Sequence, residues 1–377
     1  MKRRRVEGSN DGAAAAAAAP LPSARKGRGA VSNLAHRFET HERSVDGDTL
    51  DARLAAGEEL NAPLATEVRH ERVKSLLAYN DSPDIYFDRS INPYRGCEHG
   101  CIYCYARPTH SYLNLSPGLD FETKLVAKVN AAEVLRRELT APGYSAAIVN
   151  LGSATDAYQP VERELRITRS VLQVLAEARH PVAIVTKASL IERDLDLLAP
   201  LARQQLAAAF ISVTTLDSDL TRTLEPRAAA AARRLRTIET LARAGVPVCV
   251  NVAPVIPFVN EPEIERILEA AAAAGATGAF YTVLRLPWEV APLFRQWLQA
   301  HHPQRAERVM NRVRDMREGR DYRAEFGTRM KGSGVWAELI RQRFDKACAR
   351  FGLGRGRFDL REDLFRPPRV GPQLDLF

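Results

Sequence analysis

Short apolar runs alternate with longer Ala- and Leu-rich stretches from about residue 80 to about residue 290. Each run is rich in β-branched or aromatic residues and nearly continuous in apolar positions, which is typical of parallel strands buried on both faces. The six runs are residues 84–92, 146–152, 182–187, 208–215, 246–256 and 278–286. The pattern therefore predicts six buried strands.

The stretches between these runs are helical in pattern, most clearly at residues 161–178, 190–203, 228–244 and 261–274. Gly245 and Gly275 end two of them, where a left-handed residue is favoured. About six strand–helix repeats predict an α/β fold, a partial (β/α)6 barrel of the TIM type. A doubly wound open sheet would show the same alternation. A cysteine-rich loop directly after the first strand favours the barrel, because barrel sites lie at the carboxyl ends of the strands.

The segments that flank the predicted barrel core, residues 80–290, differ from it in composition. Residues 1–70 are poor in aromatic residues and rich in Ala, Gly and charge, which predicts a disordered arm with a short ordered piece in GRGAVSNLAHRFE. Helical patterns at residues 291–360 predict an extension that packs beside the barrel or closes its mouth. Residues 361–377 are Pro-rich and then apolar, which predicts a flexible tail.

The chain is basic, with 54 Lys and Arg against 46 Asp and Glu and a net charge of +8 over 377 residues. This balance favours polyanionic partners, nucleic acid first. No apolar run approaches the length of a membrane span, so we expect no membrane partner. The N-terminus mimics a signal peptide, but Glu7 and Asp11 interrupt it and its apolar part is only alanine. We therefore expect a cytoplasmic protein.

Three of the five cysteines, Cys97, Cys101 and Cys104, lie within eight residues in the spacing C-x3-C-x2-C. Three thiolates can hold three irons of a [4Fe–4S] cluster and leave the fourth iron open for a ligand. The alternative is structural zinc with His99 or His110 as a fourth ligand. A disulfide framework does not suit five cysteines in a chain of this length.

The residue before the third cysteine is aromatic, Tyr103. The combination C-x3-C-x-aromatic-C resembles the signature of the radical S-adenosylmethionine (SAM) superfamily. The resemblance implies that the open iron chelates SAM, and that an electron from the cluster cleaves SAM to a 5′-deoxyadenosyl radical that abstracts hydrogen from a substrate.

Polar residues follow or end the predicted strands, where a barrel would place its site. SAM needs a cation for its carboxylate, hydrogen bonds to its ribose and a slot for adenine. Lys187 or Arg285 can supply the cation, Tyr103 a wall of the slot, and Ser212 or Asn251 the ribose contacts. The same residue types also cap helices, and Asp156 is a plausible N-cap.

The strings ATDAYQPVE, IVTKASLIERD, LEPRAAAAARRL, NVAPVIP and LRLP resemble the spore photoproduct lyase-like branch of the superfamily, often labelled DNA repair photolyase. The resemblance implies that Lys187 contacts the SAM carboxylate, that Ser212 also contacts SAM, that Tyr103 lies by adenine and that Tyr105 approaches the substrate. Ser153 stands where the lyase has its hydrogen-donating cysteine. Because an O–H bond is too strong to donate hydrogen easily, we do not expect thymine-dimer reversal by the lyase's relay.

The last five residues, QLDLF, resemble the peptide by which bacterial polymerases and repair proteins dock on the DNA sliding clamp. A Pro-containing arm presents an extended peptide at low ordering cost, and apolar side chains can fill a pocket. The alternative is a C-terminus that packs its apolar end onto its own barrel. The expected clamp-binding residues are Gln373, Leu374, Leu376 and Phe377.

We therefore expect a radical SAM enzyme with one [4Fe–4S] cluster, held by the three cysteines, that acts on nucleic acid, with DNA favoured. Tyr103, Lys187, Ser212 and Asn251 are the expected SAM-binding residues. Residues expected to face substrate or SAM are Tyr105, Asp156 and Arg285. An electron donor such as flavodoxin or ferredoxin is an implied partner. The alternatives are a radical SAM enzyme on RNA, protein or a small molecule, and a zinc- or cluster-stabilised nucleic-acid-binding module without catalysis.

Overall fold

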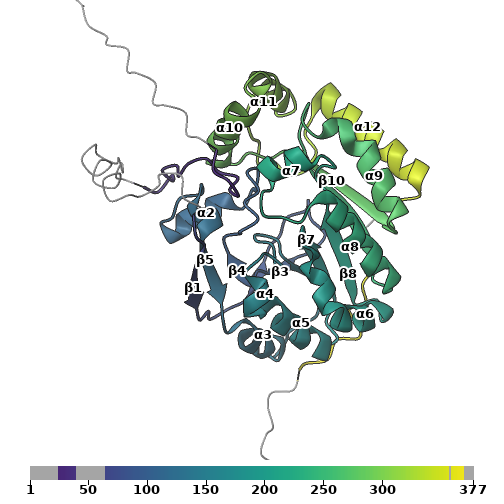
Figure 1. The fold of residues 1–377 in the computed structure, drawn as a ribbon. Coiled ribbons are helices and arrows are strands. Elements are labelled where there is room, and N and C mark those ends of the chain that lie inside the picture. Colours follow the sequence, from purple (N-terminus) through teal and green to yellow (C-terminus); the bar gives the residue numbers. More distant parts are fainter. Residues whose placement is uncertain (1–23, 40–63, 356–357, 369–377) are drawn as a thin grey trace, which may run out of the picture.

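A computed structural model describes residues 24–39, 64–355 and 358–368. Within these residues the main sheet has the strand order β10-β9-β8-β7-β6-β3-β2 (Figure 1). The six strands from β3 to β10 in this sheet are mutually parallel, and β2 adds to one edge antiparallel. Their bounds are β2 Leu77–Tyr79, β3 Arg89–Ile91, β6 Val149–Leu151, β7 Val182–Thr186, β8 Ala207–Ser212, β9 Val248–Val255 and β10 Gly278–Val283. All six predicted strands are confirmed.

Alternate residues of these strands face two different environments. On β8, Ala209 and Ile211 belong to the large core between sheet and helices, whereas Ala208 and Phe210 belong to a smaller cluster on the opposite face with Cys249 of β9. This period of two follows from the pleat of a strand. Both faces of the sheet are therefore apolar, as the continuous apolar runs predict.

Helices cover the outer face of the sheet (Figure 1). They are α3 Ala131–Leu139, α4 Glu162–Leu165, α5 Ile167–Glu177, α6 Leu195–Arg203, α8 Ala231–Arg243 and α9 Ile264–Ala273, with short 3-10 helices η2 Ser189–Asp194 and η3 Glu261–Glu263. The predicted helix at 161–178 is divided in two, because Arg166 between α4 and α5 has a positive φ of 53°. Gly245 and Gly275 have φ of 79° and 98°, so both predicted left-handed ends are confirmed.

The main sheet does not close, because β10 and β2 are its edges and do not pair with each other. Parallel strands with helices on the outside and an open seam define a partial barrel. The predicted fold class is confirmed. The two edges are bridged outside the sheet, because groups after β10 donate hydrogen bonds to Asp84, which lies between β2 and β3.

A second, three-stranded sheet with the order β1-β5-β4 lies beside the barrel (Figure 1). Its strands are β1 Glu67–Glu71, β4 Tyr94–Arg95 and β5 Lys124–Lys128, and it adjoins η1 Arg107–Leu113 and α2 Asp120–Thr123. The apolar pattern of the sequence does not predict this sheet. Its strands are short and end in charged residues, so they lack the apolar runs that mark the barrel strands.

Parts of both predicted tails are elements of the fold. Residues 24–39 and all of β1 except Glu71 fall in the predicted arm, and residues 24–39 include the expected ordered piece. Residues 358–368 comprise the end of the predicted helical extension and the start of the predicted C-terminal tail. Phe358 packs on the inner face of the sheet, and the Arg366 N–H bonds to the Ala178 carbonyl at 2.9 Å. These segments stay ordered because they bury apolar groups and satisfy backbone groups of the core.

The helices beyond β10 are α10 Val290–His301, α11 Ala306–Asp315 and α12 Gly334–Phe351, and α7 Ser218–Leu224 precedes α8. α12 packs against α9, and α10 packs against α11 (Figure 1). Among the described residues, no helix combines the length and apolar character that a bilayer span requires.

Candidate active site

The three cysteines lie in a buried loop at the carboxyl end of β3, directly after β4. Backbone hydrogen bonds fix the loop from two sides, from the Cys97 N–H to the Phe121 carbonyl at 2.9 Å and from the Ile102 N–H to the Leu224 carbonyl at 3.2 Å. The buried Arg107 side chain donates to carbonyls of the loop and of the α2 approach. These acceptors are Gly100, Cys101, Pro117 and Gly118. The loop is thus held in shape by the protein itself.

The three cysteines line one cavity of about 130 Å³, which we call the thiol cavity. Burial is the main cause that raises the pKa of the Cys97 thiol well above its usual range, and it raises the pKa of Cys101 to about 12, against the lowering effect of Lys187. A thiol of this kind gives up its proton on binding a metal, since only the thiolate is a ligand.

The donor set fits a multi-iron cluster. In the described part of the chain, no group of three or more His, Cys, Asp or Glu side chains is placed to hold one metal ion. A cubane cluster does not need such convergence, because its cysteine ligands bind different irons. Of the two histidines considered as zinc ligands, His99 lines the thiol cavity, whereas His110 bonds to the Lys124 carbonyl at 2.9 Å and lies outside it.

Asp156 fixes the far wall of the thiol cavity. Its carboxylate lies 3.3 Å from the His99 ring and accepts hydrogen bonds of 2.7 Å from the Thr186 hydroxyl and the Lys187 N–H. Burial by itself would raise the Asp156 pKa, but His99 and these hydrogen bonds outweigh it and lower the pKa to about 2. Asp156 thus joins the cysteine loop to the end of β7. His99 is a partner that sequence reasoning considered only as a metal ligand.

The predicted SAM-binding residues come together in a second cavity of about 260 Å³, which we call the middle cavity. Its lining includes Tyr103, Lys187, Ser212, Asn251 and Arg285, and it shares Cys101 and Cys104 with the thiol cavity. Ser212 and Asn251 are paired in the register of β8 and β9, which places them side by side.

Two cations face the middle cavity with different surroundings. Burial by itself would lower the Lys187 pKa, but Cys101 and Glu225 reverse this effect and raise it, so the amine stays charged. Arg285 stacks over Tyr105, with 5.0 Å from its guanidinium carbon to the ring centre, and its Nε is buried without a hydrogen-bond partner. Both can therefore offer positive charge to an anionic group in this cavity.

Glu225 is a site residue that sequence reasoning missed. It accepts a hydrogen bond from the Tyr103 hydroxyl and from Thr214 at 2.6 Å, and it forms a buried ion pair with Arg234. Burial opposes its ionisation, but Arg234 and Lys187 prevail and lower its pKa to about 2. Glu225 belongs to the LEPR string, which already carried the family resemblance, and that membership was the available signal.

A third cavity of about 370 Å³ adjoins the middle one, and we call it the aromatic cavity. Phe210 lies in its wall with Tyr86 stacked on it at 5.4 Å between ring centres, and Asn150 and Asn251 add amide groups. Tyr105 lines all three cavities, and its hydroxyl donates to the Ser153 carbonyl. The three cavities thus adjoin one another and share wall residues.

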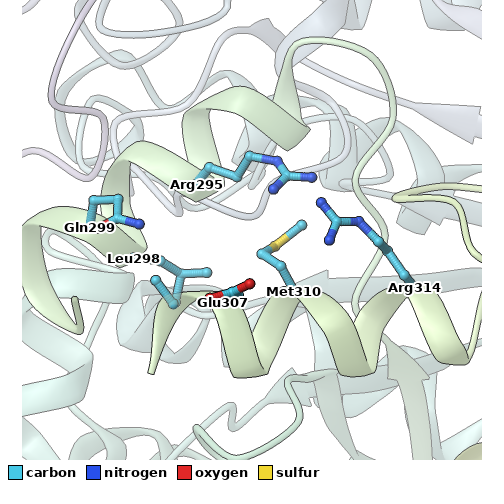
Figure 2. Close-up of a pocket in the computed structure, with 7 residues that line it drawn as sticks. Arg295, Leu298, Gln299, Glu307, Met310 and Arg314 are labelled. Atoms are coloured by element: carbon cyan, nitrogen blue, oxygen red, sulfur yellow. The ribbon is translucent and has the colours of Figure 1, made fainter. Parts of the chain in front are cut away.

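A further cavity of about 330 Å³ lies between α10 and α11 and shares no lining residue with these three (Figure 2). Its lining includes Arg295, Met310 and Arg314.

Comparison with known proteins identifies the class. The profile of the radical SAM superfamily matches residues 91–271. Uncharacterised proteins of Mycobacterium tuberculosis and Mycobacterium bovis are each 36% identical to the chain over 306 residues, which cover 80% of this chain and 86% of the relative. An uncharacterised protein of Methanocaldococcus jannaschii is 24% identical over 226 residues, covering 59% of this chain and 80% of the relative. The chain belongs to the radical SAM superfamily and is a radical SAM enzyme, whose cofactors are a [4Fe–4S] cluster and SAM.

Within that class the fold is shared with spore photoproduct lyase. Two variants of the lyase, one of them with bound S-adenosylmethionine and dinucleoside spore photoproduct, match with a TM-score of 0.53 at 15% and 16% identity. Each match covers 78% of this chain and 82% of the lyase chain.

Proposed function

We propose that this enzyme holds its cluster through Cys97, Cys101 and Cys104, binds SAM in the middle cavity and acts on nucleic acid, with DNA favoured, in the aromatic cavity. The observation that carries this proposal is that the three cavities adjoin one another and share Tyr105 as a wall residue. A reactive group generated from SAM in the middle cavity would form beside a substrate held in the aromatic cavity.

Each wall of the middle cavity has a proposed role. Lys187 and Arg285 supply positive charge for the SAM carboxylate, Ser212 and Asn251 supply hydrogen bonds, and the Tyr103 ring supplies an apolar wall. When bound and reduced, a cluster held by Cys97, Cys101 and Cys104 would supply the electron for reductive cleavage of SAM. Asp156 lies at the cysteine loop, so we propose that it positions the loop.

The aromatic cavity supports a nucleobase as the substrate group. Base rings stack on aromatic side chains, and amides such as Asn150 and Asn251 can bond to base edges. The net charge of +8 favours a polyanion. A lyase variant of the same fold carries a dinucleoside photoproduct, which agrees with this substrate class.

The return of hydrogen to the substrate must differ from that of the lyase. Ser153 lines the thiol and aromatic cavities where the lyase-like resemblance expects a cysteine. Its O–H bond is too strong to give up a hydrogen atom readily. The proposed reaction therefore ends without the lyase's cysteine step.

Two partners complete the proposal. A flavodoxin or ferredoxin supplies the electron. The tail Gln373, Leu374, Leu376 and Phe377 docks on the DNA sliding clamp; these residues lie outside the described part of the chain. We expect deletion of residues 373–377 to abolish clamp binding in a pull-down and to leave SAM cleavage unchanged. Unaltered clamp affinity would contradict the docking proposal.

The test of the reaction uses anaerobically reconstituted protein with dithionite and SAM, with and without single-stranded DNA deuterated on the sugar and base carbons. We expect 5′-deoxyadenosine in both cases and deuterium in it only with the labelled DNA. Cys101→Ala should abolish release, whereas Cys348→Ala, a buried cysteine outside the loop on α12, should retain it. Release without deuterium, or deuterium only from RNA or protein, would contradict the DNA substrate.

A further inference from the structure

Three large aromatic side chains are exposed together on this protein. Phe38 is 51% exposed, Tyr112 is 72% exposed and Trp288 is 65% exposed, and all three surround the guanidinium of Arg37. We call these four residues the aromatic patch. Burying such rings against a partner would gain far more than leaving them in water, so their grouping marks an interaction surface.

The side chains of the aromatic patch are packed against one another and against Glu289. The Arg37 guanidinium carbon lies 4.5 Å from the Trp288 ring centre and 4.6 Å from that of Phe38. Glu289 holds the guanidinium through bonds of 3.0 and 3.1 Å. Tyr112 contacts Phe38 with 5.3 Å between ring centres. A partner would therefore meet ordered ring faces at little cost in side-chain entropy.

Trp288 is held in a strained conformation. Its φ is 46°, in the left-handed region that bulky residues rarely adopt. Strain of this kind persists where the surrounding structure imposes it, often at binding sites. Here it projects an indole ring into solvent, where it contributes nothing to the core.

The aromatic patch is connected to the active site by short segments of chain. Tyr112 is at the end of η1, seven residues after Tyr105, and Trp288 is three residues after Arg285. Both Tyr105 and Arg285 line the middle cavity. The N-terminal segment that carries Phe38 runs between α2 and α10, and the Ser32 hydroxyl bonds to Gln296 of α10 at 2.8 Å (Figure 1).

The chain that follows the aromatic patch is strongly basic. Residues 290–333 contain ten Lys and Arg against five Asp and Glu, a surplus of five. On α10 and α11, Arg295 and Arg314 point toward one another above Met310, and both bond to Asp321 (Figure 2). Glu307 lines the same cavity, so Asp321 and Glu307 balance these two guanidiniums. The positive charge offered to phosphates is that of the exposed Arg305 and Arg308, which pair with no carboxylate among the described residues.

We infer that the aromatic patch is a stacking platform for unpaired bases of single-stranded nucleic acid, whose phosphates follow the basic surface of α10 and α11. This inference rests on the proposed nucleic-acid substrate. Base stacking uses π-faces and is tolerant of sequence, so the platform orients the strand and leaves recognition of the reacting nucleotide to the aromatic cavity. Single strands and locally opened duplexes are the substrate form it favours.

The test measures binding of fluorescein-labelled oligothymidylate and of a duplex of equal length to the reconstituted full chain at fixed salt. Trp288→Ala should weaken single-strand binding roughly tenfold, the loss of about one base stack, with a smaller effect on the duplex. Tyr112→Ala should also weaken single-strand binding. Tyr79→Ala is the matched control, because Tyr79 is 64% exposed and also lies beside an arginine, Arg89, but is on β2. Tyr79→Ala should bind both the single strand and the duplex with wild-type affinity.

Iron content and 5′-deoxyadenosine release without DNA should be unchanged in each variant, and Trp288→Phe should restore most of the binding. Unchanged single-strand affinity in both alanine variants would overturn the inference, as would an equal loss on the duplex. Slower reduction by flavodoxin with unaltered DNA binding would instead identify a protein-docking surface. If wild type binds no nucleic acid at any salt concentration, the proposed function itself fails.

Discussion

Individual residues of this site are held by partners that the linear sequence hides. Lys187, Ser212 and Arg285 could be proposed from their places at or near strand ends and Asn251 from its place within a strand, and the structure brings all four into one cavity. Glu225 could not be proposed from the sequence, because its burial as a charged group depends on an ion pair with Arg234. Arg234 lies nine residues later, on α8. A sequence shows residue types at strand ends, but not which distant charge neutralises a buried one.

At the residue scale, Glu225→Gln should destabilise the protein by about 3–5 kcal/mol, since it leaves the Arg234 charge buried and unpaired. Chemical unfolding of the reconstituted protein measures this. The Glu225 pKa is lowered from 4.5 to about 2. The stabilisation of the folded protein by the ionised Glu225 carboxylate is therefore complete above pH 4.5 and is lost as the pH falls through about 2. Glu338→Gln, which breaks an exposed pair with Arg341, should change stability little. Equal effects of the two variants would contradict this account of the pair.

At the scale of elements, the cysteine loop depends on a segment far away in the sequence. The buried Glu122 carboxylate accepts from the Gly29 and Ala30 N–H groups at 3.0 and 2.8 Å and pairs with Arg107 at 2.5 Å. Residues 28–30 thereby lie directly on the loop. The sequence indicated an ordered piece here, but the contact itself follows from tertiary packing.

Gly29→Ala tests this contact, because a Cβ at Gly29 would lie 1.9 Å from the Gly100 carbonyl oxygen. We expect a lower thermal midpoint and less iron per chain, with a cost of about 1–3 kcal/mol from overpacking. Gly354→Ala is the control, because its φ is not left-handed and a Cβ there would make only an ordinary contact of 3.4 Å with the Thr277 carbonyl oxygen. Wild-type iron content and midpoint in Gly29→Ala would show that the segment does not support the loop.

At the scale of the molecule, the barrel strands and the outer helices were predictable because their apolar periods are regular. The β1-β5-β4 sheet and the contacts that bridge the seam between β2 and β10 could not be predicted, because they depend on short polar segments. In the structure Asp84, between β2 and β3, accepts from the Gly327 N–H and from Arg329, both at 2.6 Å, after β10. These bonds join the two open edges of the barrel beside the aromatic cavity.

We expect Asp84→Ala to release this closure and to raise amide exchange at residues 81–87 and 326–331 about tenfold, as loss of a charged hydrogen bond predicts. Hydrogen exchange with mass spectrometry resolves both segments. Asp363→Asn, which removes an exposed pair with Arg361, should leave them unchanged. Exchange that stays at wild-type levels in Asp84→Ala would mean that other contacts close the seam.

Electron paramagnetic resonance of the reduced, anaerobically reconstituted protein, recorded with and without SAM, tests the central claim most directly. Three cysteine ligands and one open iron predict the signal of a reduced [4Fe–4S] cluster that changes when SAM is added, and neither signal nor change in Cys101→Ala. A spectrum that is indifferent to SAM, or the absence of a cluster after reconstitution of wild type, would contradict the account.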